Sequence, residues 1–280
     1  MTQTRNKFKG VRMSKHRRKQ RPQPKDLKTH QRLAMTGRAV AQGFKRTVQR
    51  KHDSQKGRRA FVTEAELKRI LKEWPSPQKN IADQLVAKYG LPNEATATKL
   101  CWYENRPWKR TELSRDAVLH HWPTIHTDFL TQTINYRVPP DMFDLIAQFD
   151  GSIICDRTRG EVSARCDSES ANVLGMNMVH EIVTGKRTVK DARRISCEST
   201  VAYNLGRSAP YAERLLFEVP KGGTEDLDKS EISGPILKQA RGKIKDWISG
   251  NGEEATDRRT FRRATKWRSA NRWSSRTPNA

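Results

Sequence analysis

The sequence predicts an α+β fold, in which helices and antiparallel β-hairpins form one domain that follows a disordered basic N-terminal arm. Three observations lead to this prediction. Positive charge is concentrated at the two ends of the chain, apolar residues recur at helical spacing behind helix-capping residues, and apolar runs flank short turns.

Charge divides the chain into three parts. Residues 1–60 hold 20 Lys and Arg against 2 Asp and Glu, residues 61–220 hold 21 against 21, and residues 221–280 hold 14 against 8. A neutral segment as long as the middle one can bury about 68–70% of its unfolded surface, whereas a self-repelling basic segment has little apolar area to bury. We therefore expect a basic disordered arm over 1–60, an α+β core over 61–220, and a polar linker, amphipathic helix and basic aromatic tail over 221–280.

Composition argues against a membrane-spanning or secreted protein. The chain has no apolar run of about 18 residues, and its N-terminus lacks the apolar stretch of a secretory signal. Cys101, Cys155, Cys166 and Cys197 form no CxxC pair, which is typical of reduced structural cysteines. We therefore expect a cytoplasmic protein with no transmembrane segment.

The basic arm contains one helix signal. Val40, Phe44 and Val48 recur at helical spacing among Lys and Arg, although Gly37 and Gly43 weaken the pattern. This weak basic amphipathic helix would lie on a polyanion or a membrane surface, or form transiently without a partner.

Two helices open the core. Thr63 followed by Glu66 is a capping-box pattern ahead of an apolar stripe. Ser76-Pro77 then starts a second helix with a cap and an N1 proline, and Gly90 ends it.

Two hairpins and three further helices follow. "KLCWYENRPWKRTEL" predicts two strands around a turn at residues 105–107, and "GSIICDRTRGEVSARC" predicts two more, with Ile153 opposite Ala164 and Cys155 opposite Val162. Helices are expected at "PDMFDLIAQF", from about Ser168 (long) and from Thr188 (short), and an apolar stripe over Leu237–Trp247 predicts one more near the C-terminus.

"NMVHEIVTGKRT" places His180 next to Glu181, which resembles the first half of a zinc-protease helix. Such a helix needs a second His four residues on, where Thr184 stands. Adjacent residues on a helix also point about 100° apart, so the pair does not readily converge on one ion. We expect His180 at the rim of a buried helix and no protease motif.

The densest histidine cluster is "LHHWPTIHTD". An extended backbone sends His120 and His121 to opposite sides, whereas His126 and Asp128 share a face. Two ligands are too few for a firm metal site, and any others must come from elsewhere in the fold. Ordinary loop histidines explain the cluster as well, so we predict no bound metal, and we expect no cofactor.

Asp156 and Glu161 lie among arginines in the second hairpin. With His126 and Asp128 they make up a candidate polar site in the core, where acids near arginines would hold a carboxyl of raised pKa or an anion subsite. A solvated hairpin with mutual ion pairs explains the same charges.

The basic termini are the strongest functional signal. Lys and Arg that neutralise phosphates release counterions, and aromatic residues among arginines stack on unpaired bases. An anionic membrane surface suits the same residues, and a solubilising tail needs no partner at all. The residues expected to contact RNA, DNA or another polyanion are Arg17, Arg18, Lys19, Arg21, Lys45, Arg46, Arg262, Arg263, Trp267, Arg268, Arg272 and Trp273.

Three core stretches resemble a family of uncharacterised bacterial proteins: "KYGLPNEATATKLCWYENRPWKRTELSRD", "HTDFLTQTINYRVPPDMFDLIAQFDGSIICDRTRGEVSARC" and "NVLGMNMVHEIVTGKRTVKDARR". The resemblance covers roughly Phe61 to Val219 and leaves out both basic ends. It implies a bacterial soluble domain and assigns no activity or catalytic residue.

The sequence therefore predicts a non-enzymatic protein that associates with nucleic acid through its basic termini. Two alternatives stay open. One is an enzyme or ligand-binding domain with a polar site in the core, and the other is a protein-interaction domain that docks through Leu237–Trp247.

Overall fold

A computed structural model of the chain describes residues 27–49, 62–231 and 238. They belong to two units: one contains α1 (Thr29–Val48), and the other is the core unit, Gln49–Lys229. The helix α1 confirms the helix predicted around Val40 and Phe44. It begins at Thr29, eleven residues before Val40. Apart from Lys238, the predicted helix at Leu237–Trp247 lies outside the described residues.

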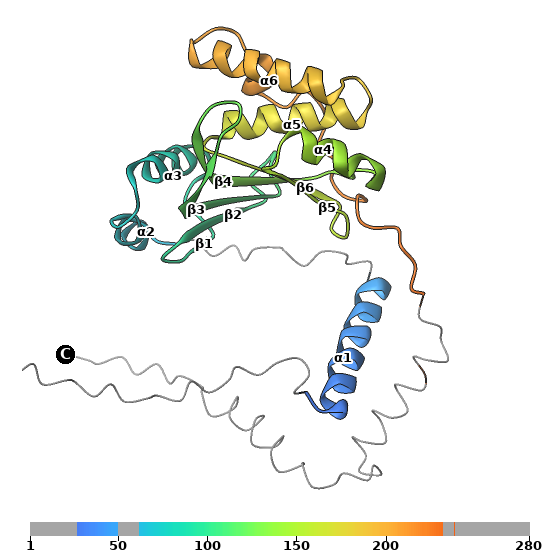
Figure 1. Cartoon of the computed structure of the whole chain (residues 1–280). Helices are drawn as coiled ribbons and strands as arrows, with labels where there is room; N and C mark the ends of the chain where they lie inside the picture. The colour runs from blue at the N-terminus through green and yellow to red at the C-terminus, as the bar shows by residue number, and fades with distance from the viewer. Residues whose placement is uncertain (1–26, 50–61, 232–237, 239–280) are drawn as a thin grey trace, which may run out of the picture. The chain divides into compact units, whose positions relative to one another are not determined.

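The core unit has an α+β fold, as predicted (Figure 1). Its helical elements are α2 (Glu64–Leu71), α3 (Ser76–Tyr89), η2 (Pro140–Met142), α4 (Phe143–Phe149), α5 (Glu169–Val183), α6 (Val189–Asn204) and α7 (Pro210–Glu213). Its strands are β1 (Glu94–Ala95), β2 (Lys99–Tyr103), β3 (Arg110–His120), β4 (His126–Asn135), β5 (Ile153–Asp156) and β6 (Glu161–Cys166). The strands form one antiparallel sheet in the order β1-β2-β3-β4-β6-β5.

Local capping determines where the core helices begin. The capping box at α2 is present: Thr63 Oγ1 accepts from the Glu66 amide at 3.3 Å, and the Glu66 carboxylate accepts from the Thr63 amide at 3.0 Å. At α3 the prediction was off by one position, because Pro75 is the N-cap and Ser76 is already helical, without a side-chain cap. Gly90 ends α3 at φ +80°, where a side chain would be strained.

The second hairpin has the predicted register, with Ile153 opposite Ala164 and Cys155 opposite Val162. The first hairpin is also confirmed, but β3 is longer than expected and reaches His120. The helix predicted to be short, from Thr188, is the 16-residue α6, and Thr188 Oγ1 caps it by accepting from the Asp191 amide at 3.1 Å.

Two groups of helices cover the same face of the sheet. Leu100, Leu113 and Leu130 are register neighbours on β2, β3 and β4, and α2 and α3 pack over them. The elements α4 to α7 pack over β4, β6 and β5, with α6 outermost (Figure 1). Gly175 lets α5 lie close, since a Cβ there would be 3.3 Å from Ile153 Cδ1. The boundary between the two groups therefore lies over β4.

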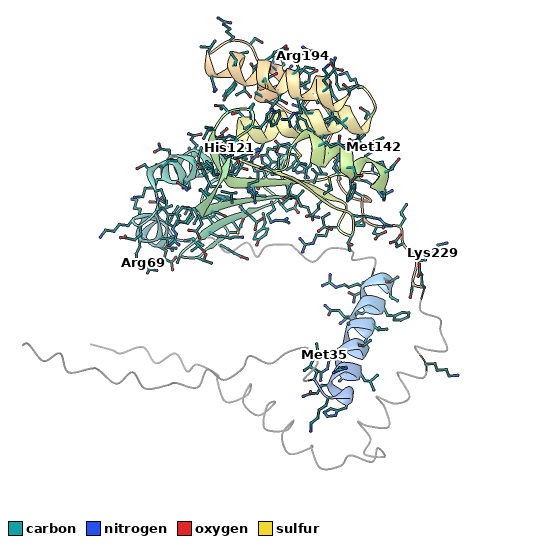
Figure 2. All side chains as sticks on the ribbon, viewed as in Figure 1. Met35, Arg69, His121, Met142, Arg194 and Lys229 are labelled. Carbon is teal, nitrogen blue, oxygen red and sulfur yellow. The ribbon has the colours of Figure 1, made fainter. Side chains whose placement is uncertain are left out.

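Side chains fill the space between the sheet and α5 (Figure 2). Trp102 and Trp108 are each 1% exposed, so the tryptophans of the first hairpin pack in the core. Within the described residues, no helix combines the length and the apolar character needed to cross a lipid bilayer.

Candidate functional site

Two histidines face each other where β3 ends and β4 begins. His120 and His126 are register partners, and their ring centroids are 4.9 Å apart. Asp128 follows on the same face of β4, with its Oδ1 3.1 Å from His126 Nε2, as the sequence predicted for this pair. His120 is the third member of the cluster, which the sequence did not assign. His121, the next residue, is exposed (labelled in Figure 2).

The carboxylate of Asp128 is 1% exposed, and its two oxygens have different surroundings. Oδ2 accepts a hydrogen bond from Ser152 Oγ and lies 3.8 Å from Arg165 Nε. Oδ1 has no hydrogen-bond donor among the described residues. A buried carboxylate oxygen without a donor is costly, so this position favours a proton or a cation between Asp128 and its neighbours.

The outward nitrogens of both histidines face acceptors. His126 Nδ1 lies 2.8 Å from the carbonyl oxygen of Thr124, which only accepts, so Nδ1 carries the hydrogen. His120 Nε2 lies 3.8 Å from a carboxylate oxygen of Asp150. When neutral, the imidazole of His126 therefore presents a bare Nε2 to the orphaned oxygen of Asp128.

Cys166 Sγ lies 3.2 Å from His126 Nε2. A Cys-His pair at this distance suggests a nucleophile, but the thiolate is the reactive form. Burial, with the negative charges of Asp167 and Asp128 as smaller contributions, raises the pKa of the Cys166 thiol far above its ordinary value. Cys166 therefore stays a neutral thiol near pH 7, and its geometry does not make it a nucleophile.

A cleft of about 970 Å³ runs between the two helix groups, and His126 and Cys166 lie on its wall. Leu130 of β4 lies at its base, α3 forms one side, and α5 and α6 form the other. The polar residues that line it are Asn80, Gln84, Lys88, Thr124, Thr127, Asp167, Ser168, Glu169, Ser170, Thr200, Tyr203, Asn204 and Glu213. The volume lies within the range of small-molecule sites, about 300–1,000 Å³.

The carboxylate of Glu169, on α5, binds side chains of α3 and β4 beside the cleft. Tyr89 Oη of α3 donates to its two oxygens at 2.9 and 3.0 Å, and Gln132 Nε2 of β4 donates at 2.9 Å. Lys88 pairs with the same carboxylate. Burial raises the pKa of Tyr89 to about 12, so its hydroxyl is a donor at neutral pH. The sequence did not point to this junction between α3 and α5.

Asp156 and Glu161 do not lie close to His126 and Asp128. The register partner of Glu161 is Asn135, at the other end of the ten-residue β4 from His126, about 30 Å away. Glu161 is instead buried beside Arg110 Nη2 at 3.3 Å and Lys109 Nζ at 2.8 Å. The four residues predicted to form one polar site therefore lie at two separate places on the sheet. The pair Asp156 and Glu161 lies at the opposite end of the strands from His126 and Asp128.

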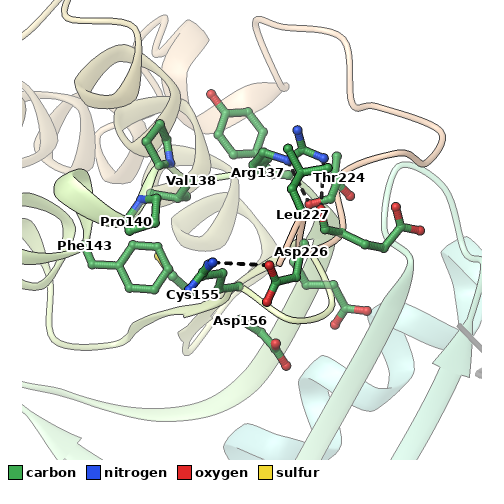
Figure 3. Close-up of a pocket in the computed structure, with 15 residues that line it drawn as sticks. Arg137, Val138, Pro140, Phe143, Cys155, Asp156, Thr224, Asp226 and Leu227 are labelled. Carbon is green, nitrogen blue, oxygen red and sulfur yellow. Dashed lines mark hydrogen bonds and ion pairs between the residues drawn. The ribbon is translucent and has the colours of Figure 1, made fainter. Parts of the chain in front are cut away.

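Asp156 and Glu161 line a second, smaller cavity of about 190 Å³ (Figure 3). Arg137 holds the neighbouring segment by donating to the carbonyl oxygens of Gly223 at 2.7 Å and Glu225 at 2.9 Å. Apolar side chains form much of the wall: Val138, Pro140, Phe143, Cys155 and Leu227. Its volume is below the usual lower bound of a ligand site, about 300 Å³.

Only some of the residues predicted to contact nucleic acid lie within the described part of the chain. Lys45 and Arg46 lie in the last turn of α1, where Lys45 is exposed and Arg46 is half-buried. The other ten residues, in 17–21 and 262–273, lie outside the described residues.

His180 and Glu181 bind different neighbours, as expected of adjacent helix positions. His180 Nδ1 lies 2.9 Å from Tyr136 Oη, and its ring stacks on Phe217 at 4.4 Å. Glu181 pairs with Lys186 at 2.5 Å and Arg187 at 2.9 Å. The two side chains therefore do not converge on one ion, as predicted from their adjacent positions.

No protein-family model, no curated protein and no solved structure matches this chain. The resemblance to a bacterial family therefore stays a prediction. A function must be argued from the geometry and chemistry of the site itself.

Proposed function

We propose that the core unit is a ligand-binding domain for a polar small molecule, neutral or positively charged, and that its site is the cleft between α3 and α5–α6. The observation that carries the proposal is the cleft itself, about 970 Å³ and lined by hydroxyl, amide and carboxylate groups from two helix groups. A large concave site with convergent polar groups is where small ligands bind.

The charges of the lining favour this class of ligand. Lys88 is the only Lys or Arg that lines the cleft in the described part of the chain, and it pairs with Glu169. Asp167 and Glu213 also line the cleft and form no ion pair within the described ranges. A surplus of carboxylates repels a polyanion and attracts a cation or a hydrogen-bond donor.

The walls also provide apolar contact. Ile81 and Leu85 line the α3 side, and Ala171, Val173 and Leu174 line the α5 side. A molecule with an apolar body and several donor groups therefore matches the cleft better than a simple ion. Ligand sites in general combine apolar walls with a few placed polar groups.

A matched pair of α6 variants tests this proposal. Thr200 lines the cleft, whereas its neighbour Val201 is 58% exposed and does not. A panel of polar metabolites is screened by thermal unfolding of the full chain, of Thr200→Trp and of Val201→Trp. A ligand at 100 times its Kd stabilises the folded state by about 2.7 kcal/mol.

We expect neutral or cationic compounds to raise the Tm of the wild type and of Val201→Trp, and to leave that of Thr200→Trp unchanged. Stabilisation by polyanions alone, or equal responses from the two tryptophan variants, would contradict the proposal. So would a panel in which no compound raises the Tm.

We also propose that the basic termini associate with nucleic acid, separately from the cleft. The support is the charge of residues 1–60 and the basic last turn of α1, with Lys45 exposed. The logarithm of the affinity for a single-stranded oligonucleotide should fall linearly with the logarithm of the salt concentration. Deletion of residues 1–60 should weaken binding at low salt, because it removes 20 Lys and Arg. Unchanged binding by the deletion variant would refute this proposal.

A further inference from the structure

We propose that His120, His126 and Asp128 bind one divalent first-row transition-metal ion. This inference goes beyond the proposed function, because the cleft can bind a ligand whether or not a metal ion lies in its wall. One ligand atom from each of the three residues lies within 4.8 Å of the other two.

The spacing of these atoms suits a small metal ion. Ligand atoms about 2.0–2.1 Å from a tetrahedral Zn²⁺ lie about 3.3 Å from one another. Asp128 Oδ1 lies 3.1 Å from His126 Nε2, and Asp128 Oδ2 lies 3.5 Å from His120 Nδ1. Each separation is close to tetrahedral spacing, and binding of one ion requires side-chain rotation, because the two nitrogens face different oxygens of Asp128.

The ring nitrogens that point away from Asp128 have the kind of neighbours that metal-binding histidines have. A histidine that binds a metal usually donates its other ring hydrogen to a carbonyl or a carboxylate. His126 Nδ1 faces the Thr124 carbonyl at 2.8 Å, and His120 Nε2 faces Asp150 at 3.8 Å. The inner nitrogens face the two oxygens of Asp128: His126 Nε2 faces Oδ1, and His120 Nδ1 faces Oδ2, which also accepts from Ser152 Oγ.

The orphaned oxygen of Asp128 is an independent observation. It belongs to a carboxylate that is 1% exposed, and no hydrogen bond reaches Oδ1 from the described residues. A proton on His126 would also relieve this contact, so a shared proton is the competing explanation. Two imidazoles and one carboxylate favour zinc, iron, nickel or copper over magnesium or calcium.

The location gives such an ion access to a ligand. His126 lines the cleft, and three protein ligands leave at least one coordination position for water or a ligand atom. A metal at this position polarises an oxygen bound to it.

Metal titration of the full chain tests the proposal. Metal-stripped protein is titrated with Zn²⁺ at pH 7.5 against a chromophoric chelator, and then with Co²⁺, whose visible absorption reports coordination. We expect one tight site in the wild type. His120→Ala, His126→Ala and Asp128→Asn should each lower the affinity by at least about 100-fold, since loss of outer contacts alone lowers it 10–100-fold.

His121→Ala is the matched control, because His121 is exposed and adjacent to the cluster. It should bind Zn²⁺ like the wild type, and so should Thr200→Trp, which separates metal binding from ligand binding in the cleft. Far-UV circular dichroism without metal checks folding, and His120→Ala provides the test if Asp128→Asn unfolds. A wild type that binds Zn²⁺ no more tightly than His126→Ala and His120→Ala would overturn the proposal in favour of a shared proton.

Discussion

Tyr136 Oη and His180 Nδ1 are 2.9 Å apart, in a small aromatic cluster that Phe217 completes. Burial raises the pKa of Tyr136, so its hydroxyl stays protonated and can either donate to His180 Nδ1 or accept from it.

This contact predicts a pH dependence of stability. Burial of the ring lowers the pKa of His180 below its ordinary value of 6.5; Glu181 opposes the shift and Lys186 adds to it. The unfolded chain therefore binds the proton more readily, so stability is complete above pH 6.5 and declines as the pH falls toward the lowered pKa.

Urea unfolding at pH 7.5 and 5.5 measures the effect. The wild type should lose more stability between these pH values than His180→Gln does. His121→Gln, which replaces an exposed histidine, should follow the wild type. An identical pH response of wild type and His180→Gln would contradict the prediction.

Gly160 adopts φ +63°. It lies beside Thr224, whose carbonyl oxygen accepts a hydrogen bond from Arg137. A Cβ at this position would lie 1.9 Å from the carbonyl oxygen of Thr224. Gly160→Ala should therefore destabilise the core by more than the backbone strain alone, about 1–3 kcal/mol.

Gly185→Ala separates the two effects, because Gly185 has φ +70° and a Cβ added there would meet nothing within 4 Å. Chemical denaturation should show a larger loss of stability for Gly160→Ala than for Gly185→Ala. Equal losses would mean that the contact with Thr224 does not constrain the fold.

The carboxylate of Glu181 binds side chains of the loop that follows α5. Burial raises the pKa of its carboxyl, but hydrogen bonds from Lys186, Arg187 and Tyr211 outweigh that effect and leave the pKa below its ordinary value of 4.5. The ionised carboxylate therefore stabilises the fold above pH 4.5, and this contribution is lost as the pH falls through the lowered pKa.

Glu181→Gln should cost about 1–3 kcal/mol at pH 7, since it removes charge-assisted hydrogen bonds from a buried acceptor. The difference from the wild type should shrink in denaturation experiments below pH 4.5. Glu198→Gln removes the exposed pair with Arg194 and should change stability by less than about 0.5 kcal/mol. A cost of Glu181→Gln that does not change with pH would rule out the charge-based explanation.

The junction at Glu169 predicts a mechanical link between α3 and α5. Glu169→Ala removes the acceptor for Tyr89 and Gln132, which should cost about 1–3 kcal/mol of stability. Amide hydrogen exchange should then increase along α3. Unchanged protection of α3 in this variant would show that packing alone holds the helix.

Features set by nearby residues could be predicted from the sequence. The capping box needs only Thr63 and Glu66, and the register of the second hairpin follows from apolar alternation around a short turn. Both are confirmed. The nearness of His126 and Asp128 was predictable for the same reason, because residues two apart on a strand share a face.

Features that depend on distant pairing could not be predicted in this way. The position of His120 depends on the β3–β4 register, which shifts between Leu113 and Val118. Ser152 comes from the start of a different hairpin, and nothing in the local pattern relates it to Asp128. Pro123, between two extended stretches, was the one local signal for a turn that brings His120 opposite His126.

Anomalous X-ray scattering from crystals of the full chain grown with Zn²⁺ would locate the proposed metal ion. We expect a zinc peak about 2.0–2.2 Å from a nitrogen of His120, a nitrogen of His126 and an oxygen of Asp128, beside the cleft. Strong zinc peaks elsewhere, with none among these three side chains, would contradict it.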